Sequence, residues 1–389
     1  MARTGSLSTK GVLKRLDAWM APALCRLFPR VSRDFVGRGR LSPGEVRRIL
    51  IVRPGGMGDA VLTLPMVSRL SEFFSGAEID VLAEQRNAAV YRLEDPDRRI
   101  FRYDVAPAQT WRELRRRRYD LVIDTEQFHR LSTLFAVSCA PRFLCGFDTL
   151  GRRRFQTHSV PYSEREYEVR SFLALAEAVT GRMESFDPEA TFLRLAPRWV
   201  EESGRVLCGR SERPLAALMV AAGAPERRWP AERFGDVARW LRGRGFDVVL
   251  IGGRDGVPGA AVVESRLERG GVLNLAGKAD LGQTAGVLAR CQVCVSPDTG
   301  VLHIAYALGV PTVGLFGSGL QGKWGPPGSR NRAINKGLPC SPCTRGGVTP
   351  PCPREHACMQ AIGVDDVLVA LSSLLDGAGA GTKAGERCV

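Results

Sequence analysis

Short apolar runs alternate with helix-length segments along most of the chain after residue 45. The runs are rich in Val, Ile and Leu, and polar or helical stretches separate them. Five of them occupy the first half, namely RRILIVR, AEIDVLAE, RIFRYDV, DLVIDTE and PRFLCGF. Such alternation is typical of strand–helix–strand units that build a parallel sheet with both faces covered.

A polar, proline-containing stretch at residues 195–214 interrupts this pattern, which then begins again. The second series comprises PLAALMVAAG, FDVVLIGG, GVLNLAG, QVCVSPD and PTVGLFG. The sequence therefore predicts an α/β protein made of two doubly wound, Rossmann-like domains that face each other across a cleft. We assign residues 46–205 and 206–376 to the two domains and residues 377–389 to a flexible tail. A ligand is expected at the carboxyl ends of the strands.

The first 45 residues form a basic extension of different character. Residues 1–40 contain nine Lys and Arg against two Asp, a charge of +7 that is half of the net +14 of the chain. Apolar residues recur at three- and four-residue steps over residues 12–28, which predicts an amphipathic helix kinked at Pro22. Such a helix either packs on its own domain or lies on an anionic membrane surface.

Two further features bear on where the chain works. No apolar run is long enough to span a membrane, and the amino end lacks the clean apolar core of a signal peptide. We therefore expect a cytoplasmic protein, peripheral on the cytoplasmic face of the inner membrane. Anionic lipid is the expected partner of the basic extension, and nucleic acid is not an expected partner.

A glycine-rich turn, RPGGMGDAVLTLP, follows the first apolar run. Gly55, Gly56 and Gly58 allow a tight bend and close backbone approach to a ligand. The turn lacks both the spacing of a dinucleotide fingerprint and the Lys-Ser/Thr ending of a P-loop. Asp59 follows the glycines at the start of a helix, where it is either a carboxylate of the helix end or a general base. Glu126, which ends DLVIDTE, is a weaker candidate for the same cleft.

In the second half, the run QVCVSPD leads directly into a helix through TGVLHIAYALG. Asp298, Thr299 and Gly300 open this helix, whose first backbone N–H groups can bind a phosphate or diphosphate. His303 lies one turn further along, on the face expected to look toward the same ligand. The alternative is a capping aspartate with a histidine that faces the core.

Three positive charges follow other strands of the same half. Arg227 and Arg228 lie in AAGAPERRWPAERF after the first of these strands, and Lys278 follows GVLNLAG. Guanidinium and ammonium groups at this edge of a sheet can neutralise phosphate oxygens. Solvated surface charges are the alternative interpretation.

Four of the eleven cysteines gather in nineteen residues near the carboxyl end, whereas the others are scattered and are expected to be small buried residues. The four are Cys340, Cys343, Cys352 and Cys358. The Cys-x2-Cys pair has the spacing of a zinc knuckle, but the second pair lacks it. A structural zinc site, a loop of reduced thiols and a redox-labile disulfide all remain open.

Taken together and in this order, these motifs resemble glycosyltransferase family 9, the lipopolysaccharide heptosyltransferases. The resemblance rests on ILIVRPGGMGDAVLTLP, GAPERRWPAERF, NLAGKADL, SPDTGVLHIAYALGVPTVGLFG, PCSPC and ACMQAI, and it covers about residues 46–375. It implies the glycosyltransferase B fold, in which the amino half binds the acceptor and the carboxyl half binds the nucleotide sugar.

The resemblance also implies roles for individual residues. Asp59 would be the catalytic base, and the helix opened by Asp298 would cradle the diphosphate of the donor. The family commonly has lysine where this chain has Arg227, so the phosphate contact would differ in reach. An acidic position of the family is replaced by Arg254 and Asp255, which leaves the donor nucleotide open.

The implied reaction is inverting transfer of a heptose from ADP-heptose to a lipopolysaccharide core or similar lipid-linked oligosaccharide, with no cofactor required for catalysis. Two alternatives belong to other classes. A nucleotide-sugar epimerase with a related two-domain fold would act on a free UDP-sugar without an acceptor. A non-catalytic, membrane-associated protein would bind nucleotide sugars without turnover.

Overall fold

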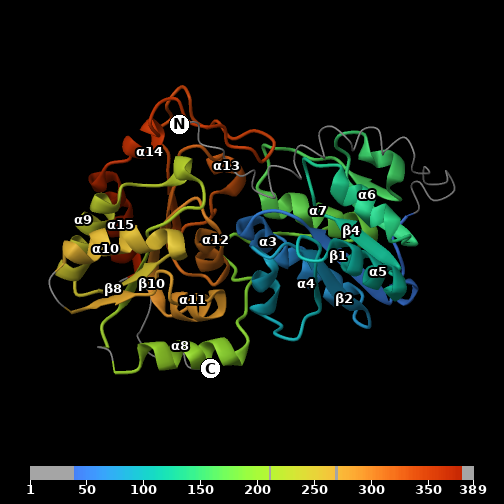
Figure 1. Ribbon diagram of the computed structural model, residues 1–389, viewed down its shortest axis with the longest axis horizontal. Helices are drawn as coiled ribbons and strands as arrows, with labels where there is room; N and C mark the ends of the chain where they lie inside the picture. The colour runs from blue at the N-terminus through green and yellow to red at the C-terminus, as the bar shows by residue number, and fades with distance from the viewer. Residues whose placement is uncertain (1–38, 210–211, 268–269, 379–389) are drawn as a thin grey trace, which may run out of the picture. The chain divides into compact units, whose positions relative to one another are not determined.

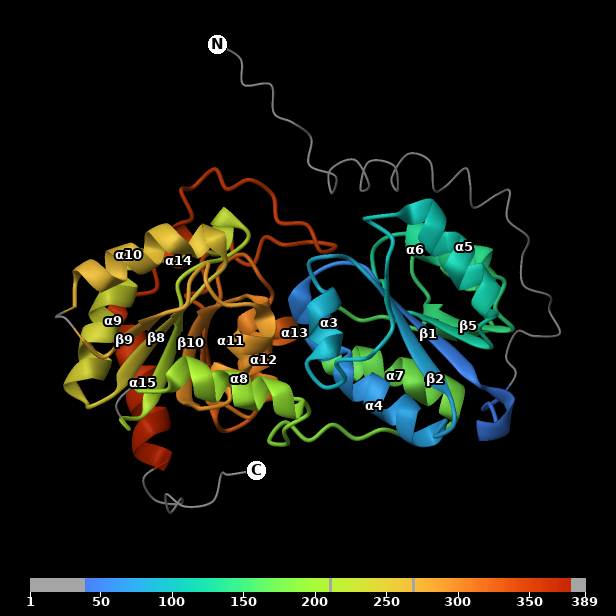
Figure 2. The same ribbon diagram turned by 60° about the horizontal axis from the view of Figure 1, so that its bottom comes forward.

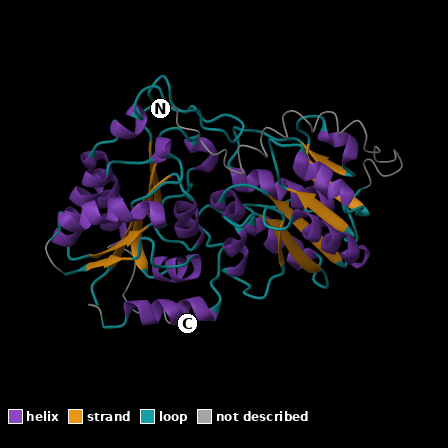
Figure 3. Cartoon of the chain, in the orientation of Figure 1, coloured by secondary structure: helices purple, strands orange, loops and turns teal. Residues whose placement is uncertain are grey.

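The computed structural model describes residues 39–209, 212–267 and 270–378. The predicted amphipathic helix and residues 379–389 of the predicted tail lie outside the described residues. By their contacts the residues divide into two compact units, one of Met1–Arg92 with Asp97–Phe186 and one of Leu93–Pro96 with Asp187–Val389. Strands gather in two places in the cartoon, each surrounded by helices (Figure 3).

The first unit contains one sheet of six strands in the order β3-β2-β1-β4-β5-β6, with every strand pair parallel. Helices α4 and α7 contact each other along one face of this sheet, while α5 and α6 cover the other (Figure 2). The strands are β1 (Arg48–Arg53), β2 (Glu78–Ala83), β3 (Ile100–Arg102), β4 (Leu121–Asp124), β5 (Phe143–Phe147) and β6 (His158–Val160). The helices are α3 (Met57–Leu62), α4 (Leu64–Phe73), α5 (Pro107–Arg117), α6 (Leu131–Ser138) and α7 (Glu168–Thr180).

The central strands of this sheet are buried on both faces, as their continuous apolar runs predict. Five of the six residues of β1 are buried, and all four of β4 are. On the face covered by α5 and α6, Val52 and Val122 form a core cluster with Leu114 and Leu134 from these helices. Burial of these aliphatic side chains is the main driving force that fixes the helices on the sheet.

The second unit repeats this architecture (Figure 1). Its six parallel strands follow the order β12-β11-β10-β7-β8-β9. The strands are β7 (Leu215–Met219), β8 (Asp247–Ile251), β9 (Val272–Asn274), β10 (Cys291–Pro297), β11 (Thr312–Leu315) and β12 (Asn331–Ile334). Read from its opposite edge, this order is identical to that of the first unit, third-second-first-fourth-fifth-sixth. The predicted fold class, two doubly wound α/β halves, is confirmed.

Helices of the second unit pack on both faces of its sheet. One core cluster joins α9 and α15 to the strands, and within it the rings of Trp229 and Phe234 meet edge to face with centroids 4.8 Å apart. The helices are α8 (Pro197–Leu207), α9 (Ala231–Gly243), α10 (Val257–Ser265), α11 (Leu281–Leu288), α12 (Gly300–Ala307), α13 (Gln321–Trp324), α14 (Ala357–Gln360) and α15 (Val364–Ala378). None of the described helices combines the length and apolar character needed to cross a membrane.

The boundary between the units lies at Asp187, earlier than the residue 205 taken from the sequence. The polar stretch at residues 195–214 contains α8, which packs on α11 in the second unit. This packing is close, because a Cβ added at Gly282 would lie 2.3 Å from the Trp199 ring and one at Gly286 would lie 2.3 Å from the Trp199 carbonyl oxygen. An amphipathic helix with few buried positions of its own was not recognisable as part of the second half.

All ten predicted strands are present, and the described residues contain two further strands that were not predicted. Both missed strands, β6 and β12, are short, relatively polar and at a sheet edge. In each unit the strand order reverses between two central neighbours, β1 and β4 in the first and β7 and β10 in the second. Open α/β sheets bind ligands beyond the carboxyl ends of the strands at such a point.

Candidate active site

The glycine-rich turn connects the end of β1 at Arg53 with the start of α3 at Met57. Gly55 has φ +109°, and a Cβ added there would lie 3.0 Å from Nη2 of Arg53. Both the backbone conformation and this close approach require glycine. Gly56 is the N-cap residue of α3, and Gly58 lies in the first turn of that helix. The turn therefore bends tightly, as predicted, but what it closes over is the Arg53 side chain.

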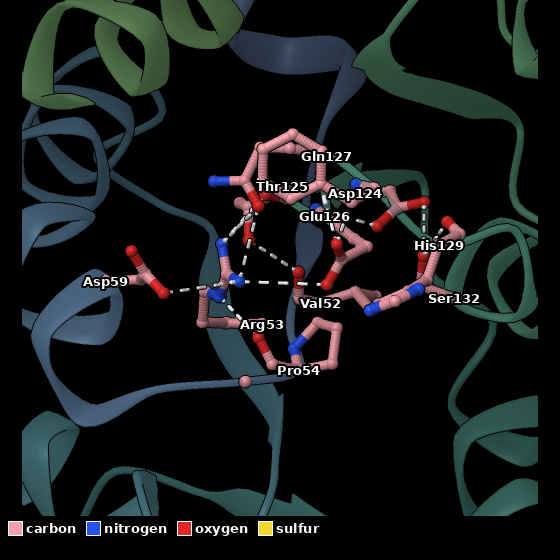
Figure 4. A network of polar contacts seen from close by, with 12 residues as sticks. Val52, Arg53, Pro54, Asp59, Asp124, Thr125, Glu126, Gln127, His129 and Ser132 are labelled. Carbon is pink, nitrogen blue, oxygen red and sulfur yellow. Dashed lines mark hydrogen bonds and ion pairs between the residues drawn. The ribbon is translucent and has the colours of Figure 1, made fainter. Parts of the chain in front are cut away.

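Asp59 is the third residue of α3 and points back toward the end of β1 (Figure 4). Its Oδ2 lies 3.9 Å from Nη2 of Arg53, and its side chain is 27% exposed. Gly56 is the N-cap, so Asp59 does not cap the helix, and no hydrogen bond to its carboxylate is found within the described part of the chain. A partly exposed carboxylate, held by a charge but not occupied by hydrogen bonds, is suited to accept a proton.

Arg53 is buried at the carboxyl end of β1, with a side chain 2% exposed. Its guanidinium donates hydrogen bonds from Nε to the Pro54 carbonyl at 2.6 Å and from Nη1 to the Thr125 carbonyl at 2.9 Å. Burial by itself lowers the pKa of Arg53, but the charges of Asp59 and Glu126 outweigh it and raise the pKa above its ordinary value. Arg53 is therefore a permanent cation inside the first unit.

Glu126 is the second carboxylate beside Arg53 and is buried. Its Oε2 lies 3.7 Å from Nη2 of Arg53, while its Oε1 accepts hydrogen bonds from the backbone N–H groups of Gln127 at 3.0 Å and Phe128 at 2.8 Å. The loop after β4 thus fixes Glu126 on one side of the guanidinium, with Asp59 on the other (Figure 4). From its sequence context alone, Glu126 is a weaker candidate for a functional residue than Asp59.

A second buried ion pair contacts the same loop, because the Glu126 N–H donates to Oδ1 of Asp124 at 3.2 Å. Asp124, the last residue of β4, accepts hydrogen bonds from Ser132 and Thr133 and lies 3.7 Å from Nη1 of Arg152. Burial raises the pKa of Asp124, and Arg152 counteracts this with its positive charge. Neither arginine was predicted from the sequence, although a charged residue that ends the apolar run RILIVR is a signal for Arg53.

In the second unit, Asp298, Arg227 and His303 lie together at the carboxyl ends of β7 and β10. Nη1 of Arg227 is 3.1 Å from Oδ2 of Asp298 and donates a hydrogen bond to the Asp298 carbonyl at 3.3 Å. Nε2 of His303 is 3.9 Å from Oδ1 of the same carboxylate. The side chain of Asp298 is 5% exposed and that of Arg227 is 28% exposed. Asp298 thus holds the arginine and is not the residue that opens the helix.

Thr299 is the N-cap residue of α12, with extended backbone at φ −140° and ψ 166°, and Gly300 is the first residue of the helix. The Thr299 side chain makes no capping hydrogen bond, and its Oγ1 instead lies 3.0 Å from the Ser296 hydroxyl. The first N–H groups of α12 are therefore not satisfied by the usual side-chain cap, which suits a helix end that binds an anion.

The other two predicted phosphate contacts are more exposed. Nη2 of Arg228 lies 3.9 Å from Oδ2 of Asp255, and half of the Arg228 side chain is exposed. Lys278 is exposed in the turn after β9, at the outer edge of the sheet, and no partner for its ammonium is found among the described residues. The structure brings Arg227, Asp298 and His303 into contact, whereas it does not bring Lys278 to them.

Three of the four clustered cysteines, Cys340, Cys343 and Cys352, lie on a loop that docks beyond the end of β11, and Cys358 lies in α14. The backbone N–H groups of Cys343 and Thr344 donate to the Ser318 carbonyl at 3.1 and 2.9 Å. Burial raises the pKa of the Cys343 and Cys358 thiols, with a smaller contribution from the neighbouring cysteines. All the described cysteines are free, and the described residues contain no group of three or more His, Cys, Asp or Glu side chains placed to hold a metal ion. The structural zinc site stays a prediction.

Comparison with known proteins adds an independent observation. A family model described as "Glycosyltransferase family 9 (heptosyltransferase)" matches residues 108–350, more than half of the chain. The chain belongs to glycosyltransferase family 9. The resemblance stated from the motifs is therefore confirmed.

Curated relatives of this family 9 chain are similar along most of their length. Lipopolysaccharide heptosyltransferase 1 of Pseudomonas aeruginosa is 26% identical over 318 residues, which covers 77% of this chain and 86% of the relative. Lipooligosaccharide heptosyltransferase 2 of Haemophilus ducreyi is 25% identical over 310 residues, covering 74% and 88%.

Solved structures of the family share the fold. ADP-heptose lps heptosyltransferase II of Escherichia coli superposes with a TM-score of 0.69 at 21% identity, covering 85% of this chain and 99% of that one. A family 9 glycosyltransferase from Veillonella parvula gives a TM-score of 0.73 at 19% identity, covering 87% and 99%. The glycosyltransferase B fold implied by the motifs is thereby confirmed.

Proposed function

We propose that this family 9 chain is an inverting heptosyltransferase that transfers heptose from ADP-heptose to a lipopolysaccharide core or similar lipid-linked oligosaccharide. The observation that carries the chemistry is Asp59, a partly exposed carboxylate that faces a buried cation and is not consumed by hydrogen bonds. The relatives named as lipopolysaccharide heptosyltransferases support the sugar and the acceptor class. A solved structure of Escherichia coli heptosyltransferase WaaC holds ADP-2-deoxy-2-fluoro heptose, which supports the donor.

In the proposed reaction, Asp59 accepts the proton of the acceptor hydroxyl while that oxygen attacks the anomeric carbon of the donor. The bond from this carbon to the diphosphate oxygen breaks, and the electron pair leaves with ADP. Arg227, Arg228 and the first N–H groups of α12 stabilise the negative charge that develops on the departing diphosphate. Displacement from the opposite face inverts the anomeric centre.

The decisive experiment is transfer in vitro, with the purified chain, ADP-heptose and lipid glycan from a strain that lacks this gene. Mass spectrometry should show one added heptose on the glycan, and ADP should be released in equal amount. If the sugar nucleotide is altered without any acceptor, the chain is an epimerase. If the donor binds but neither transfer nor hydrolysis occurs, the chain is a non-catalytic binding protein. Because the chain belongs to a family of transferases, transfer is favoured over both the epimerase and the non-catalytic binding protein.

We also propose that fixed positive groups replace a divalent ion in this reaction. Arginine side chains and the amino end of a helix already provide the charge that a bound metal would supply to a diphosphate. Transfer should therefore be unchanged by EDTA. A structural metal at Cys340, Cys343, Cys352 and Cys358 is a separate prediction, tested by metal analysis of protein purified without added zinc. Absence of metal with four reactive thiols would reject it.

The membrane-facing part of the proposal concerns the basic extension at residues 1–45. Its charge favours anionic lipid on the cytoplasmic face of the inner membrane, where the acceptor would be encountered. The full chain should sediment with vesicles that contain anionic lipid and should be released as the salt concentration rises. A chain that ignores such vesicles at low salt contradicts the proposal.

A further inference from the structure

The buried guanidinium of Arg53 contacts both the glycine-rich turn and the loop after β4. Its guanidinium ties the end of β1 to the loop after β4 through the carbonyls of Pro54 and Thr125 and through Oε1 of Gln127 at 3.4 and 3.5 Å. The β1–β4 register, which pairs Val52 with Asp124, places these groups side by side. The ring of Phe172 lies 5.7 Å from the guanidinium carbon and adds a cation–π contact.

The turn itself is held from two sides. On one side, Gly55 lies so close to Nη2 of Arg53 that an added Cβ would approach this nitrogen to 3.0 Å. The position of the guanidinium therefore constrains the backbone of the turn. From the side, the Gly55 N–H donates to Oε1 of Glu84 at 3.2 Å, and Tyr103 donates its hydroxyl to the same oxygen at 2.6 Å. Asn87 completes the support with a hydrogen bond to the Arg53 carbonyl at 3.0 Å.

One nitrogen of Arg53, Nη2, faces both carboxylates. The distances, 3.9 Å to Asp59 and 3.7 Å to Glu126, are too long for hydrogen bonds but short enough for strong attraction in a buried site. The backbone N–H groups of Gln127 and Phe128 fix Glu126 in place, so it holds the guanidinium back from Asp59. Asp59 is therefore oriented by a charge that does not occupy its oxygens.

We propose that Arg53 is a positioning residue, whose buried guanidinium and contact with the Gly55 turn orient the Asp59 carboxylate. Glu126 attracts the same guanidinium from the other side and so limits its pull on Asp59. The proposal rests on the proposed function, in which Asp59 accepts the proton of the acceptor. Displacement of a catalytic group by about 1 Å can cost about 100-fold in rate, so this support matters for turnover. Donor binding depends on groups in the second unit and does not depend on Arg53.

Two substitutions at Arg53 separate its charge from its hydrogen bonds. Arg53→Lys keeps the charge but loses the forked donors, so kcat should fall about 10- to 100-fold with ADP affinity unchanged. Arg53→Met also removes the charge, so the acid limb of the pH profile of kcat/KM should move to higher pH. Glu126→Gln should move that limb in the opposite direction, because Arg53 then acts more strongly on Asp59. A purely structural role predicts no such opposite shifts.

Arg152→Lys is the matched control, because Arg152 is equally buried in the same unit and pairs with Asp124, not with Asp59. It should lower stability but leave the pH profile unchanged. A fall in kcat as large as that of Arg53→Lys, or a shift of the pH profile in this control, would overturn the proposal. If Arg53→Met fails to fold, Arg53→Lys and Glu126→Gln still carry the test.

Asp59→Asn, measured beside these variants, distinguishes the two proposals. If Asp59→Asn abolishes transfer while both Arg53 variants keep the wild-type kcat and pH profile, the positioning role is wrong and the base assignment stands. If Asp59→Asn transfers at nearly the wild-type rate, the base assignment is wrong and the role of Arg53 falls with it.

Discussion

In the first unit the arginine of the central ion pair is buried and its acid is partly exposed, whereas in the second unit the acid is buried and the arginine is partly exposed. Arg53 and Asp59 are 2% and 27% exposed, and Arg227 and Asp298 are 28% and 5% exposed. Both pairs lie at the carboxyl ends of central strands, in sheets with the same strand order.

This inversion assigns different tasks to the members of each pair. A buried charge must be compensated by partners, and in both units the buried member receives them. The exposed member can then meet a ligand. The first unit presents a carboxylate, which can accept a proton, and the second unit presents a guanidinium, which can bind phosphate. One fold thus supports opposite chemistry through the choice of which charge is covered.

The strongest test of this comparison is removal of the exposed acid. Asp59→Asn should lower kcat for transfer by about 10²- to 10⁴-fold, the usual loss for a general base, because an amide cannot take the proton. Affinity for ADP, measured by calorimetry, should stay within a few-fold of wild type. A fall in ADP affinity as large as the fall in kcat would mean that Asp59 belongs to donor binding, and the comparison would fail.

Removal of the exposed arginine should act on the donor instead. Arg227→Ala should weaken ADP about 10- to 100-fold, since a hydrogen bond between charged groups contributes about 1.5–3 kcal/mol. Arg228→Ala should have a smaller effect, because that side chain is more exposed. Gly300→Val should also weaken ADP by placing a branched side chain at the start of α12. If all three variants bind ADP as wild type does, the diphosphate site lies elsewhere.

The buried acid of the second unit should matter more for stability than for chemistry. Asp298→Asn leaves Arg227 without its ion-pair partner and should cost about 1–3 kcal/mol in the free energy of unfolding. Asp59→Asn, at the partly exposed acid of the first unit, should cost less. Urea unfolding of the two variants compares these losses directly. The reverse order would show that exposure does not separate structural from chemical roles here.

A smaller effect concerns the acid that supports the glycine-rich turn. Burial would raise the pKa of Glu84, but the hydrogen bond from Tyr103 and the charge of Arg86 outweigh it, and the pKa lies below its ordinary value of 4.5. Its contribution to stability is therefore present above that value and is lost as the pH falls below it. Glu84→Gln should flatten the pH dependence of unfolding below about pH 5, by at most about 1.4 kcal/mol per pH unit.

Glu72, which is exposed on α4 with 59% of its side chain accessible, offers the matched control for Glu84. Urea unfolding of the wild-type chain, Glu84→Gln and Glu72→Gln is measured between pH 3.5 and about pH 5.5, a window that spans about one unit either side of the pKa of a free glutamate. Glu72→Gln should retain the wild-type dependence. An unchanged slope in Glu84→Gln would mean that ionised Glu84 does not support the turn.

Most of the fold could be predicted because strands buried on both faces appear in the sequence as continuous apolar runs. The edge strands β6 and β12 could not, since a short strand with one neighbour needs few apolar residues. Likewise the boundary predicted at residue 205 falls within α8, because the partner of this helix, α11, lies far along the chain.

The site was predictable where local sequence determines geometry and not where distant strands meet. Asp59 and the start of α12 follow from a glycine-rich turn and a strand-to-helix junction. The partners of Arg53 depend on the register between β1 and β4, and those of Asp298 depend on the pairing of β7 with β10. Neither pairing can be read from residue spacing, so Arg53 was not recognised and Asp298 was expected to open α12.

The shortness of the outermost strands has a consequence for how the protein behaves at high concentration. The four edge strands, β3, β6, β9 and β12, have only three or four residues each, while the longer apolar strands lie inside the sheets. An exposed strand edge is a template on which another chain can add a strand and begin to aggregate. These sheets offer such a template over only three or four residues at each edge, so adding a strand is a poor route to unwanted association even though the apolar content of the chain is high.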